Sequence, residues 1–371
     1  MTAKYLHIVS FDVPFPPNYG GVIDVFYKIK ALHEAGVKII LHCFEYGREE
    51  ARELETYCEQ VFYYKRQMNR SLLFHTLPYI VVSRRSEVLM ERLLNDQHPI
   101  LFEGLHSCYH LNDIRLRGRI CLVRNHNIEH DYYNSLAQVE KSVFRKMYFK
   151  REAVKLRAFE KVMTLASSVL AISRADEETL KKRYSNVQLV SAFHPNGQVS
   201  ICTGQGNFAL YHGNLEVGEN NEAAIYLATQ VFSDSNVPLI VAGKNPSAEL
   251  VDAISKQKNI TLQGNILTNE IDVLIREAQI NVLPTFQATG IKLKLLAALF
   301  NGRHCLVNSP MVSNTGLETL CSIADTPVSM RAEVDRLFNL SFEPGAIIRR
   351  EQVLCPAFSN RESLQKLLKL I

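Results

Sequence analysis

The stretch INVLPTFQATGIKLKLLAALFNGRHCLVNS (280–309) decides the fold class. It begins with a short apolar run typical of a strand, passes through a loop that reaches Gly290, and continues as a helical pattern from about Ile291. A second apolar run follows at 305–309. A strand, a helix and a second strand in this order form a right-handed βαβ unit, so the two strands are expected to be parallel.

The same alternation extends over the rest of the chain. Further strands are predicted at 5–10, 37–44, 61–64, 100–104, 120–125, 168–173, 186–191, 208–213, 238–243 and 260–264, with helix-length segments between them. The runs are nearly continuously apolar, which is typical of strands covered by helices on both faces. We therefore predict an α/β protein with two facing, doubly wound, Rossmann-like parallel-sheet domains.

The segment PNGQVSICTGQGN (195–207) interrupts this alternation and is predicted to be the domain linker, because it is rich in Gly, Ser, Thr and Asn. It separates an N-terminal domain (1–194) from a C-terminal domain (208–355). The closing residues 356–371 predict a short amphipathic helix that packs back on the N-terminal domain. Two such domains are expected to bind a ligand between the carboxyl ends of their sheets.

Composition excludes several classes of protein. Hydrophobic residues make up 47% and charged residues 22% of the 371 residues, which excludes a disordered or collagen-like chain. The net charge of +4 is too small for a nucleic-acid binder. Membrane-length apolar runs, a signal-peptide core, C-x-x-C pairs and a D-x-D motif are missing, so we expect a cytoplasmic protein without a metal or other cofactor.

The first candidate site is the predicted helix start at Gly290. A helix N-terminus favours anions, and Lys292 and Lys294 add two ammonium groups, so the pattern predicts a diphosphate site. Because residues two apart lie on different faces of a helix, we expect Lys292 to be the lysine that reaches the ligand. Lys244 in AGKNPS is a further candidate cation.

Two further candidates follow predicted strands of the first half. Gly20-Gly21 opens a helix after FDVPFPPNY (11–19) and would let a ligand approach the backbone, although a tight turn explains the pair equally well. His126 stands just past the strand 120–125, where such folds bind ligands, although histidines at such places are often structural.

Five segments in order resemble the retaining, family-4-like glycosyltransferases of the GT-B fold (glycosyltransferase group 1). They are PFPPNYGG (14–21), HNIEHDYY (126–133), AISRADEETL (171–180), HGNLEVGENNEAAIYL (212–227) and TGIKLKLLAAL (289–299). The resemblance implies that Gly20 and Gly21 lie beside the donor diphosphate and that His126 contacts the transferred sugar. It also implies that the helix from Gly290 meets the diphosphate.

The sequence departs from the family at the donor site. Two glutamates eight residues apart are usual around this glycine, whereas the chain has Thr289 and Ala297 there. The usual Arg and Lys after the first strand of the C-terminal domain fall near Asn214 and Glu219. Lys292, Lys294 or Lys244 could supply the missing positive charge, and a related branch does place lysines as in GIKLK.

The resemblance implies transfer of a hexose from a nucleotide sugar, expected to be UDP- or GDP-linked, to a surface glycan or glycolipid, with retention and without a metal. If the enzyme inverts, Asp12 and Glu103 are the candidate general bases. One alternative is a degenerate glycosyltransferase that serves as a binding or scaffold subunit. Another is a nucleotide-sugar epimerase.

The segment KSVFRKMYFKREAVKLRAFEK (141–161) is basic and has Phe144, Tyr148, Leu156 and Phe159 at helical spacing. These residues are typical of a stripe that faces the core beneath a solvated basic face. The alternative is peripheral contact with the inner face of the membrane, which would suit a lipid-linked acceptor.

Overall fold

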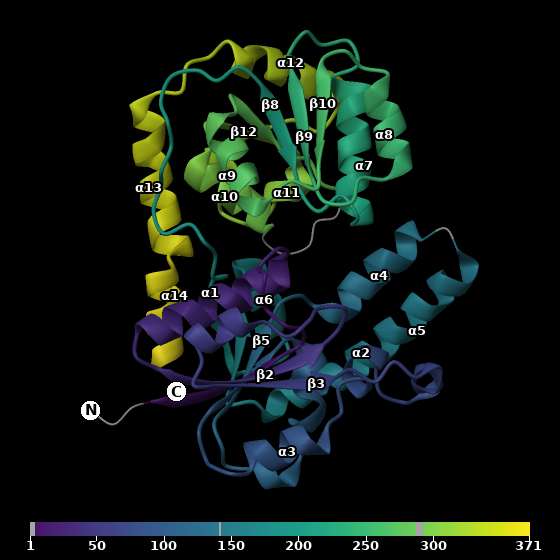
Figure 1. Cartoon of the computed structure of the whole chain (residues 1–371), viewed down its shortest axis with the longest axis vertical. Helices are drawn as coiled ribbons and strands as arrows, with labels where there is room; N and C mark the ends of the chain where they lie inside the picture. Colours follow the sequence, from purple (N-terminus) through teal and green to yellow (C-terminus); the bar gives the residue numbers. More distant parts are fainter. Residues whose placement is uncertain (1–3, 141, 287–291) are drawn as a thin grey trace. The chain divides into compact units, whose positions relative to one another are not determined.

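The computed structural model describes residues 4–140, 142–286 and 292–371. The chain divides into two compact units (Figure 1). Unit 1 comprises Met1–Pro195 and Phe358–Ile371, and unit 2 comprises Asn196–Ala357.

Unit 1 is built on a seven-stranded sheet in which all neighbouring strands are parallel, in the order β3-β2-β1-β4-β5-β6-β7. The strands are β1 (Tyr5–Ser10), β2 (Lys38–Glu45), β3 (Gln60–Lys65), β4 (Ile100–Glu103), β5 (Cys121–Asn125), β6 (Ser168–Ala171) and β7 (Val187–Leu189). The chain adds β2 and β3 on one side of β1 and then β4 on its other side, so the winding direction reverses between β1 and β4.

Helices cover both faces of this sheet. They are α1 (Gly20–Glu34), α2 (Tyr79–Val82), α3 (Glu87–Leu93), α4 (Glu129–Val139), α5 (Val143–Phe159), α6 (Arg174–Lys181) and α14 (Asn360–Leu368). Leu6 and Ile8 of β1 belong to one apolar cluster, which includes residues of α1 and α14, whereas Val9 belongs to a second cluster with residues of α3 and α5. This alternation is expected of a strand that is buried on both faces.

The C-terminal segment returns to unit 1 through α14. Leu367 is fully buried in the cluster that contains α1, and the Ser363 hydroxyl donates to the carbonyl of Ser191 at 3.1 Å. The sequence predicted a single helix over residues 356–371. The structure instead has the end of α13 (Pro344–Phe358) and then α14 in this segment.

Unit 2 has a six-stranded parallel sheet in the order β10-β9-β8-β11-β12-β13, and its winding reverses between β8 and β11. The strands are β8 (Ala209–His212), β9 (Leu239–Gly243), β10 (Ile260–Gly264), β11 (Ile280–Val282), β12 (His304–Val307) and β13 (Ser322–Ile323). Its other helices are α7 (Gly218–Tyr226), α8 (Ala248–Ser255), α9 (Thr268–Glu277), α10 (Leu293–Asn301), α11 (Ser309–Val312) and α12 (Pro327–Phe338). The predicted α/β class with two doubly wound parallel sheets is confirmed. In the described part of the chain, no helix combines the length and the apolar character that a membrane span requires.

Candidate functional site

Each unit has one point where the strand order reverses, and ligands of doubly wound sheets bind beyond the carboxyl ends of the strands at that point. In unit 1 the reversal lies between β1 and β4, and the residues directly after these strands are Phe11 and Gly104. In unit 2 the reversal lies between β8 and β11, and the residues directly after these strands are Gly213 and Leu283.

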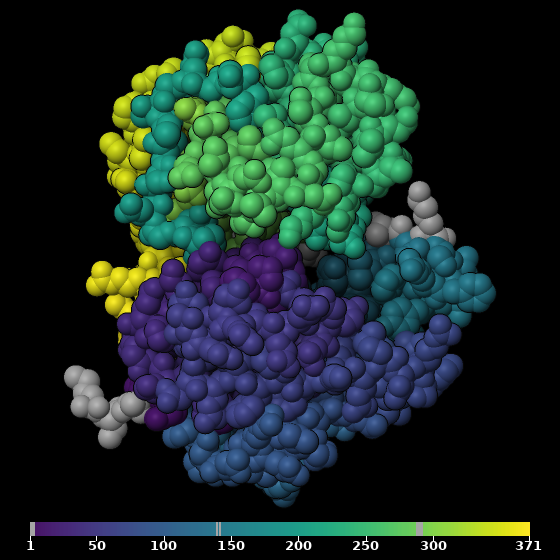
Figure 2. All heavy atoms as spheres, viewed as in Figure 1, coloured from purple at the N-terminus to yellow at the C-terminus, as the bar shows by residue number. Residues whose placement is uncertain are grey.

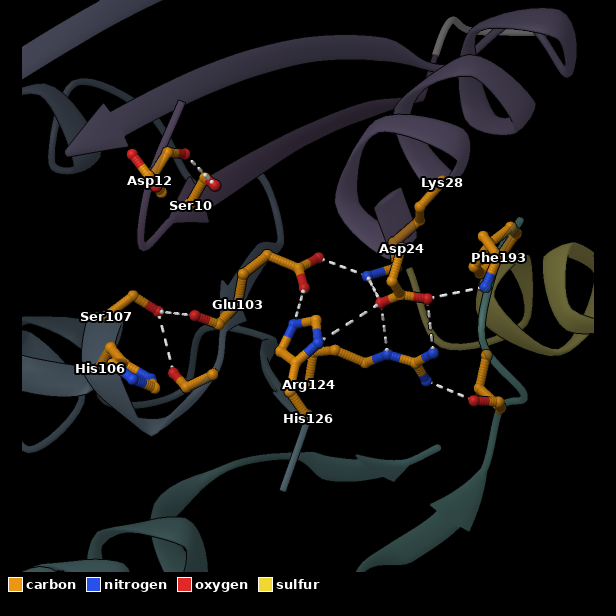
Figure 3. A network of polar contacts seen from close by, with 12 residues as sticks. Ser10, Asp12, Asp24, Lys28, Glu103, His106, Ser107, Arg124, His126 and Phe193 are labelled. Carbon is orange, nitrogen blue, oxygen red and sulfur yellow. Dashed lines mark hydrogen bonds and ion pairs between the residues drawn. The ribbon is translucent and has the colours of Figure 1, made fainter. Parts of the chain in front are cut away.

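A network of buried charges lies beside the reversal point of unit 1 (Figure 3). Lys28 Nζ of α1 donates to Asp24 Oδ2 at 2.9 Å and to Glu103 Oε1 at 2.6 Å. The Arg124 guanidinium forms two further bonds to Asp24, from Nε at 3.0 Å and from a terminal nitrogen at 2.9 Å. Asp24, Lys28, Glu103 and Arg124 are each at most 1% exposed. This network therefore holds two cations and two carboxylates away from water.

His126 completes this network. Its Nε2 lies 2.9 Å from Glu103 Oε2, and its Nδ1 lies 3.9 Å from Asp24 Oδ2. Figure 3 shows both ring nitrogens directed toward these carboxylates. The sequence correctly placed His126 at the carboxyl end of β5, and its contact with a sugar stays a prediction.

The surrounding charges keep both carboxylates ionised. Burial raises the pKa of Asp24, but the positive charges of Arg124 and Lys28 outweigh burial and lower the pKa overall. The pKa of Glu103 is also lowered, because Lys28 and the His126 hydrogen bond outweigh the effect of burial.

Asp24, Glu103 and His126 are also the group of described residues that could hold a metal ion, since their ligand atoms lie within 4.8 Å of one another. Lys28 Nζ already bonds to both carboxylates. A metal ion would have to displace this ammonium group, so the charges that surround the two carboxylates do not favour one.

The structure places the two predicted glycines at the start of α1 and gives them different surroundings. A Cβ on Gly21 would lie 2.7 Å from Phe11 Cζ, whereas a Cβ on Gly20 would meet nothing within 4 Å. Gly21 therefore lets the Phe11 ring pack against the first turn of α1. A role of the pair beside a diphosphate stays a prediction.

Asp12, the other candidate base, is 3% exposed and already paired. Its Oδ1 accepts from the backbone N–H of Val13 at 2.9 Å, and its Oδ2 accepts from the Tyr19 hydroxyl at 2.8 Å. Burial raises the pKa of Asp12. All four carboxylate oxygens of Asp12 and Glu103 thus accept hydrogen bonds from described residues.

Two residues near the reversal point of unit 1 were not predicted. His106 follows β4, and its ring lies 5.4 Å from the ring of Phe11, which in turn lies 5.4 Å from the ring of His126. Glu129 is the first residue of α4 and is 3% exposed. The position of His106 three residues beyond β4 could have indicated it, but only the fold brings Glu129 to it.

In unit 2 the predicted lysines lie at the start of α10. Lys292 is the N-cap residue and its Nζ lies 2.9 Å from Glu219 Oε1. Glu219, in the first turn of α7, also accepts a hydrogen bond from the Thr285 hydroxyl beyond β11. Lys294 Nζ donates to Asn220 Oδ1 at 2.8 Å.

Both lysines therefore contact the start of α7, contrary to the expectation from residues two apart on a helix. The reason is that α10 begins at Leu293, two residues later than predicted, so Lys292 has extended backbone and does not follow helical spacing. The Lys292 side chain does not cap the helix. A helix start without a side-chain cap and with two lysines is suited to an anion.

Burial lowers the pKa of two groups at this site, Lys294 and His212. Burial, assisted by the charge of Lys292, lowers the pKa of Lys294 to about 8. Burial and the neighbouring Lys294 charge lower the pKa of His212, the last residue of β8, to about 3. His212 Nε2 is buried and has no hydrogen-bond partner among residues 4–140, 142–286 and 292–371.

The remaining predictions for unit 2 are only partly described. Thr289 and Gly290 lie outside the described residues. Ala297 packs against the apolar cluster of α9, and Lys244 is exposed just beyond β9. Glu219 is part of an ion pair in which Lys292 supplies the cation.

Comparisons with known proteins bear on this geometry. No family model matches the chain. An uncharacterised 44.6 kDa protein in the cps region of Klebsiella pneumoniae is 27% identical over 328 residues, which cover 83% of this chain and 84% of the relative.

Two solved structures resemble the chain over nearly its whole length. Sucrose-phosphate synthase from Thermosynechococcus elongatus has a TM-score of 0.70 at 14% identity, covering 99% of this chain and 98% of that one. Staphylococcus aureus TarM, as a G117R mutant in complex with fondaparinux, α-GlcNAc-glycerol and UDP, has a TM-score of 0.66 at 10% identity, covering 100% and 99%. The chain therefore has the GT-B fold.

Proposed function

We propose that the protein is a glycosyltransferase that moves a hexose from a UDP- or GDP-linked donor to a surface glycan or glycolipid. The observation that carries the proposal is the lysine pair at the start of α10, which lies at the reversal point of a GT-B unit. The relative in a cps region and the UDP bound to TarM support the kinds of acceptor and donor.

On the donor side, Lys292 and Lys294 bind the diphosphate. An arriving phosphate oxygen competes with Glu219 for Lys292, so the ion pair keeps this cation in place when no donor is bound. Lys294 is held toward Asn220 and becomes a stronger donor as water leaves the site. Thr289, Gly290 and Lys244 are proposed to contribute further donor contacts.

Catalysis follows from positioning and from stabilisation of the leaving diphosphate by Lys292 and the helix dipole, without a metal. Retention is the expected outcome. His126 is proposed to contact the transferred sugar, and the network of Asp24, Glu103 and Lys28 fixes its ring. An activity that 5 mM EDTA abolishes and Mg²⁺ or Mn²⁺ restores would refute the metal-independent mechanism.

A thermal-shift panel with UDP, GDP, CMP and their sugar conjugates tests donor binding. A ligand at a hundred times its dissociation constant stabilises the folded state by about 2.7 kcal/mol, which raises the melting temperature measurably. We expect one nucleotide to raise it in the wild type but not in Lys292→Met or Lys294→Met. Lys256→Met is the control, since Lys256 pairs with Asp252 on the surface of α8. No shift in cooperatively melting wild-type protein would favour a binding or scaffold subunit.

We also propose peripheral contact with an anionic membrane through α5. Phe144, predicted to face the core, is 86% exposed and Val154 is 72% exposed, whereas Leu156 is buried. We call the exposed side of this helix the α5 patch. It consists of Val143, Phe144, Arg145, Met147, Lys150, Arg151, Val154 and Arg157.

The charge of the α5 patch suits anionic lipid. The one glutamate of α5, Glu152, is buried and pairs with Lys155, and Glu160, just beyond the helix, is buried and pairs with His130. Glu140, just before the helix, lies 3.9 Å from Arg145 of the patch. The exposed side is thus apolar and basic, and Figure 2 shows the α4–α5 hairpin as a lobe at the edge of unit 1. Apolar side chains among cations are typical of helices that lie on anionic bilayers.

Vesicle sedimentation tests this contact. We expect binding to phosphatidylcholine vesicles with 30% phosphatidylglycerol at low salt, and weaker binding at 0.5 M NaCl or after Phe144→Ser with Met147→Ser. Val328→Ser is the control, because Val328 is 80% exposed on α12. Equal sedimentation of the wild type and the double variant contradicts the proposal. Failure of the wild type to sediment with anionic vesicles at low salt contradicts it as well.

A further inference from the structure

Three side chains meet at Gly104, beyond β4 in unit 1. A Cβ at Gly104 would lie 3.0 Å from His106 Nδ1, 3.6 Å from His126 Cδ2 and 3.7 Å from Phe11 Cδ1. Gly104 also has a φ of 71°, a backbone conformation that favours glycine. The chain thus brings two imidazoles and a phenyl ring together at the reversal point of the sheet.

One buried polar atom at this place lacks a partner. His106 Nδ1 is buried and has no hydrogen-bond partner in the described part of the chain. Glu129 is 3% exposed, and His106 Nδ1 lies 3.9 Å from its Oε1, too far for a hydrogen bond. Native proteins pair nearly all such groups with protein, water or ligand.

The groups around Glu129 affect its protonation. Burial, followed by the charge of Glu160, raises the pKa of Glu129 to about 8, and Arg84 acts in the opposite direction. The other titratable groups that face it are His106 and Tyr133. Burial and the charge of Arg84 lower the pKa of His106 well below its usual value. At neutral pH the pair is therefore an uncharged acid beside an uncharged imidazole.

We propose that Phe11, His106 and Glu129 form a subsite for a sugar ring, whose hydroxyls bond to the Glu129 carboxyl and to His106 Nδ1 while the Phe11 ring contacts its C–H face. Uncharged polar groups beside an aromatic ring suit a polyhydroxylated ring better than an anion. Neither the buried charge network nor the lysines of α10 contribute these groups. The inference rests on the proposed function, and the ring belongs either to the acceptor or to the transferred sugar.

Saturation-transfer NMR on the full chain tests this subsite. The probes are the methyl glycosides of glucose, galactose, mannose and N-acetylglucosamine, and separately the UDP- and GDP-sugars. We expect saturation of the sugar-ring protons in the wild type, reduced at least fivefold in Glu129→Leu and in His106→Ala. Glu129→Gln should retain the saturation at every pH, whereas in the wild type it should fall as the pH rises above about 8, where Glu129 loses its proton. Glu152→Gln is the control, since Glu152 is a buried glutamate on α5 that pairs with Lys155.

The outcomes separate this inference from the proposed function. Methyl-glycoside signals that persist in the presence of the nucleotide sugar assign the ring to the acceptor, whereas displaced signals assign it to the transferred sugar. Sugar signals without any signal from nucleotide protons would support the subsite and refute the proposed binding of a nucleotide-sugar donor. Nucleotide signals without sugar signals, or sugar signals that are unchanged in cooperatively folded Glu129→Leu and His106→Ala, overturn the subsite. Silence from both kinds of proton overturns both proposals.

Discussion

Glu129 makes the stability of the protein depend on pH. Its pKa is raised from 4.5 to about 8, so between these values the folded chain holds a proton that the unfolded chain has released. The free energy of unfolding therefore falls as the pH rises through this window, by up to about 1.4 kcal/mol per pH unit. In Glu129→Gln, which has no such proton, we expect this contribution to be missing.

Urea unfolding at pH 6 and pH 8 measures the difference. The stability of Glu129→Gln relative to the wild type should increase by roughly 2–3 kcal/mol over these two pH units. Glu152→Gln should retain the wild-type slope, because Glu129 is intact in that variant. A slope in Glu129→Gln equal to that of the wild type would show that Glu129 titrates at an ordinary pH.

Lys28 is the buried cation on which Asp24 and Glu103 both depend. Lys28→Met would leave two buried carboxylates with one cation fewer, and we expect a loss of about 3–5 kcal/mol in the free energy of unfolding. Lys38→Met removes the same kind of pair from the surface, where Lys38 bonds to Glu59 with 48% of its side chain exposed. That change should cost far less than Lys28→Met, because solvent screens an exposed pair. Equal losses in the two variants would contradict the account of the network.

The sequence predicted only some residues of the buried charge network and none of the residues proposed for the sugar subsite. His126 and Glu103 could be predicted because each stands at the end of a strand. Asp24 and Lys28 could not, because two opposite charges four residues apart on α1 are typical of an exposed helix face. Only the fold brings Arg124 and Glu103 against them, and the lack of a partner at His106 Nδ1 is likewise invisible in a single sequence.

At the scale of the helix, the two glycines of α1 form a matched pair. Gly21→Ala would force its Cβ against the Phe11 ring at 2.7 Å, and we expect a loss of about 1–3 kcal/mol in stability. Gly20→Ala meets nothing within 4 Å and should be neutral or stabilise the helix by up to about 1 kcal/mol. Denaturant unfolding of the two variants measures these stabilities. A loss of stability in Gly20→Ala as large as that in Gly21→Ala would contradict the role of the Phe11 contact.

The start of α10 should bind nucleotide in a pH-dependent manner. The pKa of Lys294 is lowered to about 8, so its charge is lost as the pH rises above that value. We expect nucleotide affinity to fall between pH 7 and pH 9.5 in the wild type, but less in Lys294→Arg, because arginine stays charged. Calorimetric titration at several pH values measures this, and indistinguishable profiles would mean that Lys294 does not contact the phosphates.

Strands were easier to predict than helix ends. The apolar run at 5–10 coincides with β1, because a strand buried on both faces leaves a continuous pattern. The start of α10 was placed two residues early, since nothing in the sequence marks Lys292 as its extended N-cap residue. The exposure of Phe144 was also missed, because helical spacing alone does not distinguish a side that faces the core from one that faces outward.

At the scale of the whole molecule, alternation of strands and helices was sufficient to predict two doubly wound sheets. The strand orders place a reversal point in each unit, and the charged groups described above gather at both. At the point in unit 2, Glu219 and Lys292 are paired. The fold was therefore predictable from pattern, whereas the contents of the site depend on contacts that only the structure gives.

Donor turnover tests the central claim most directly. UDP- and GDP-sugars would be incubated with the full chain and the methyl glycosides, and release of nucleoside diphosphate followed together with the anomeric configuration of the product by NMR. We predict release from one nucleotide sugar, transfer to a glycoside with retention, and at least a hundredfold loss in Lys294→Met but not in Lys256→Met. A wild-type protein that binds a nucleotide yet releases no diphosphate from any donor would contradict the claim that it is a glycosyltransferase.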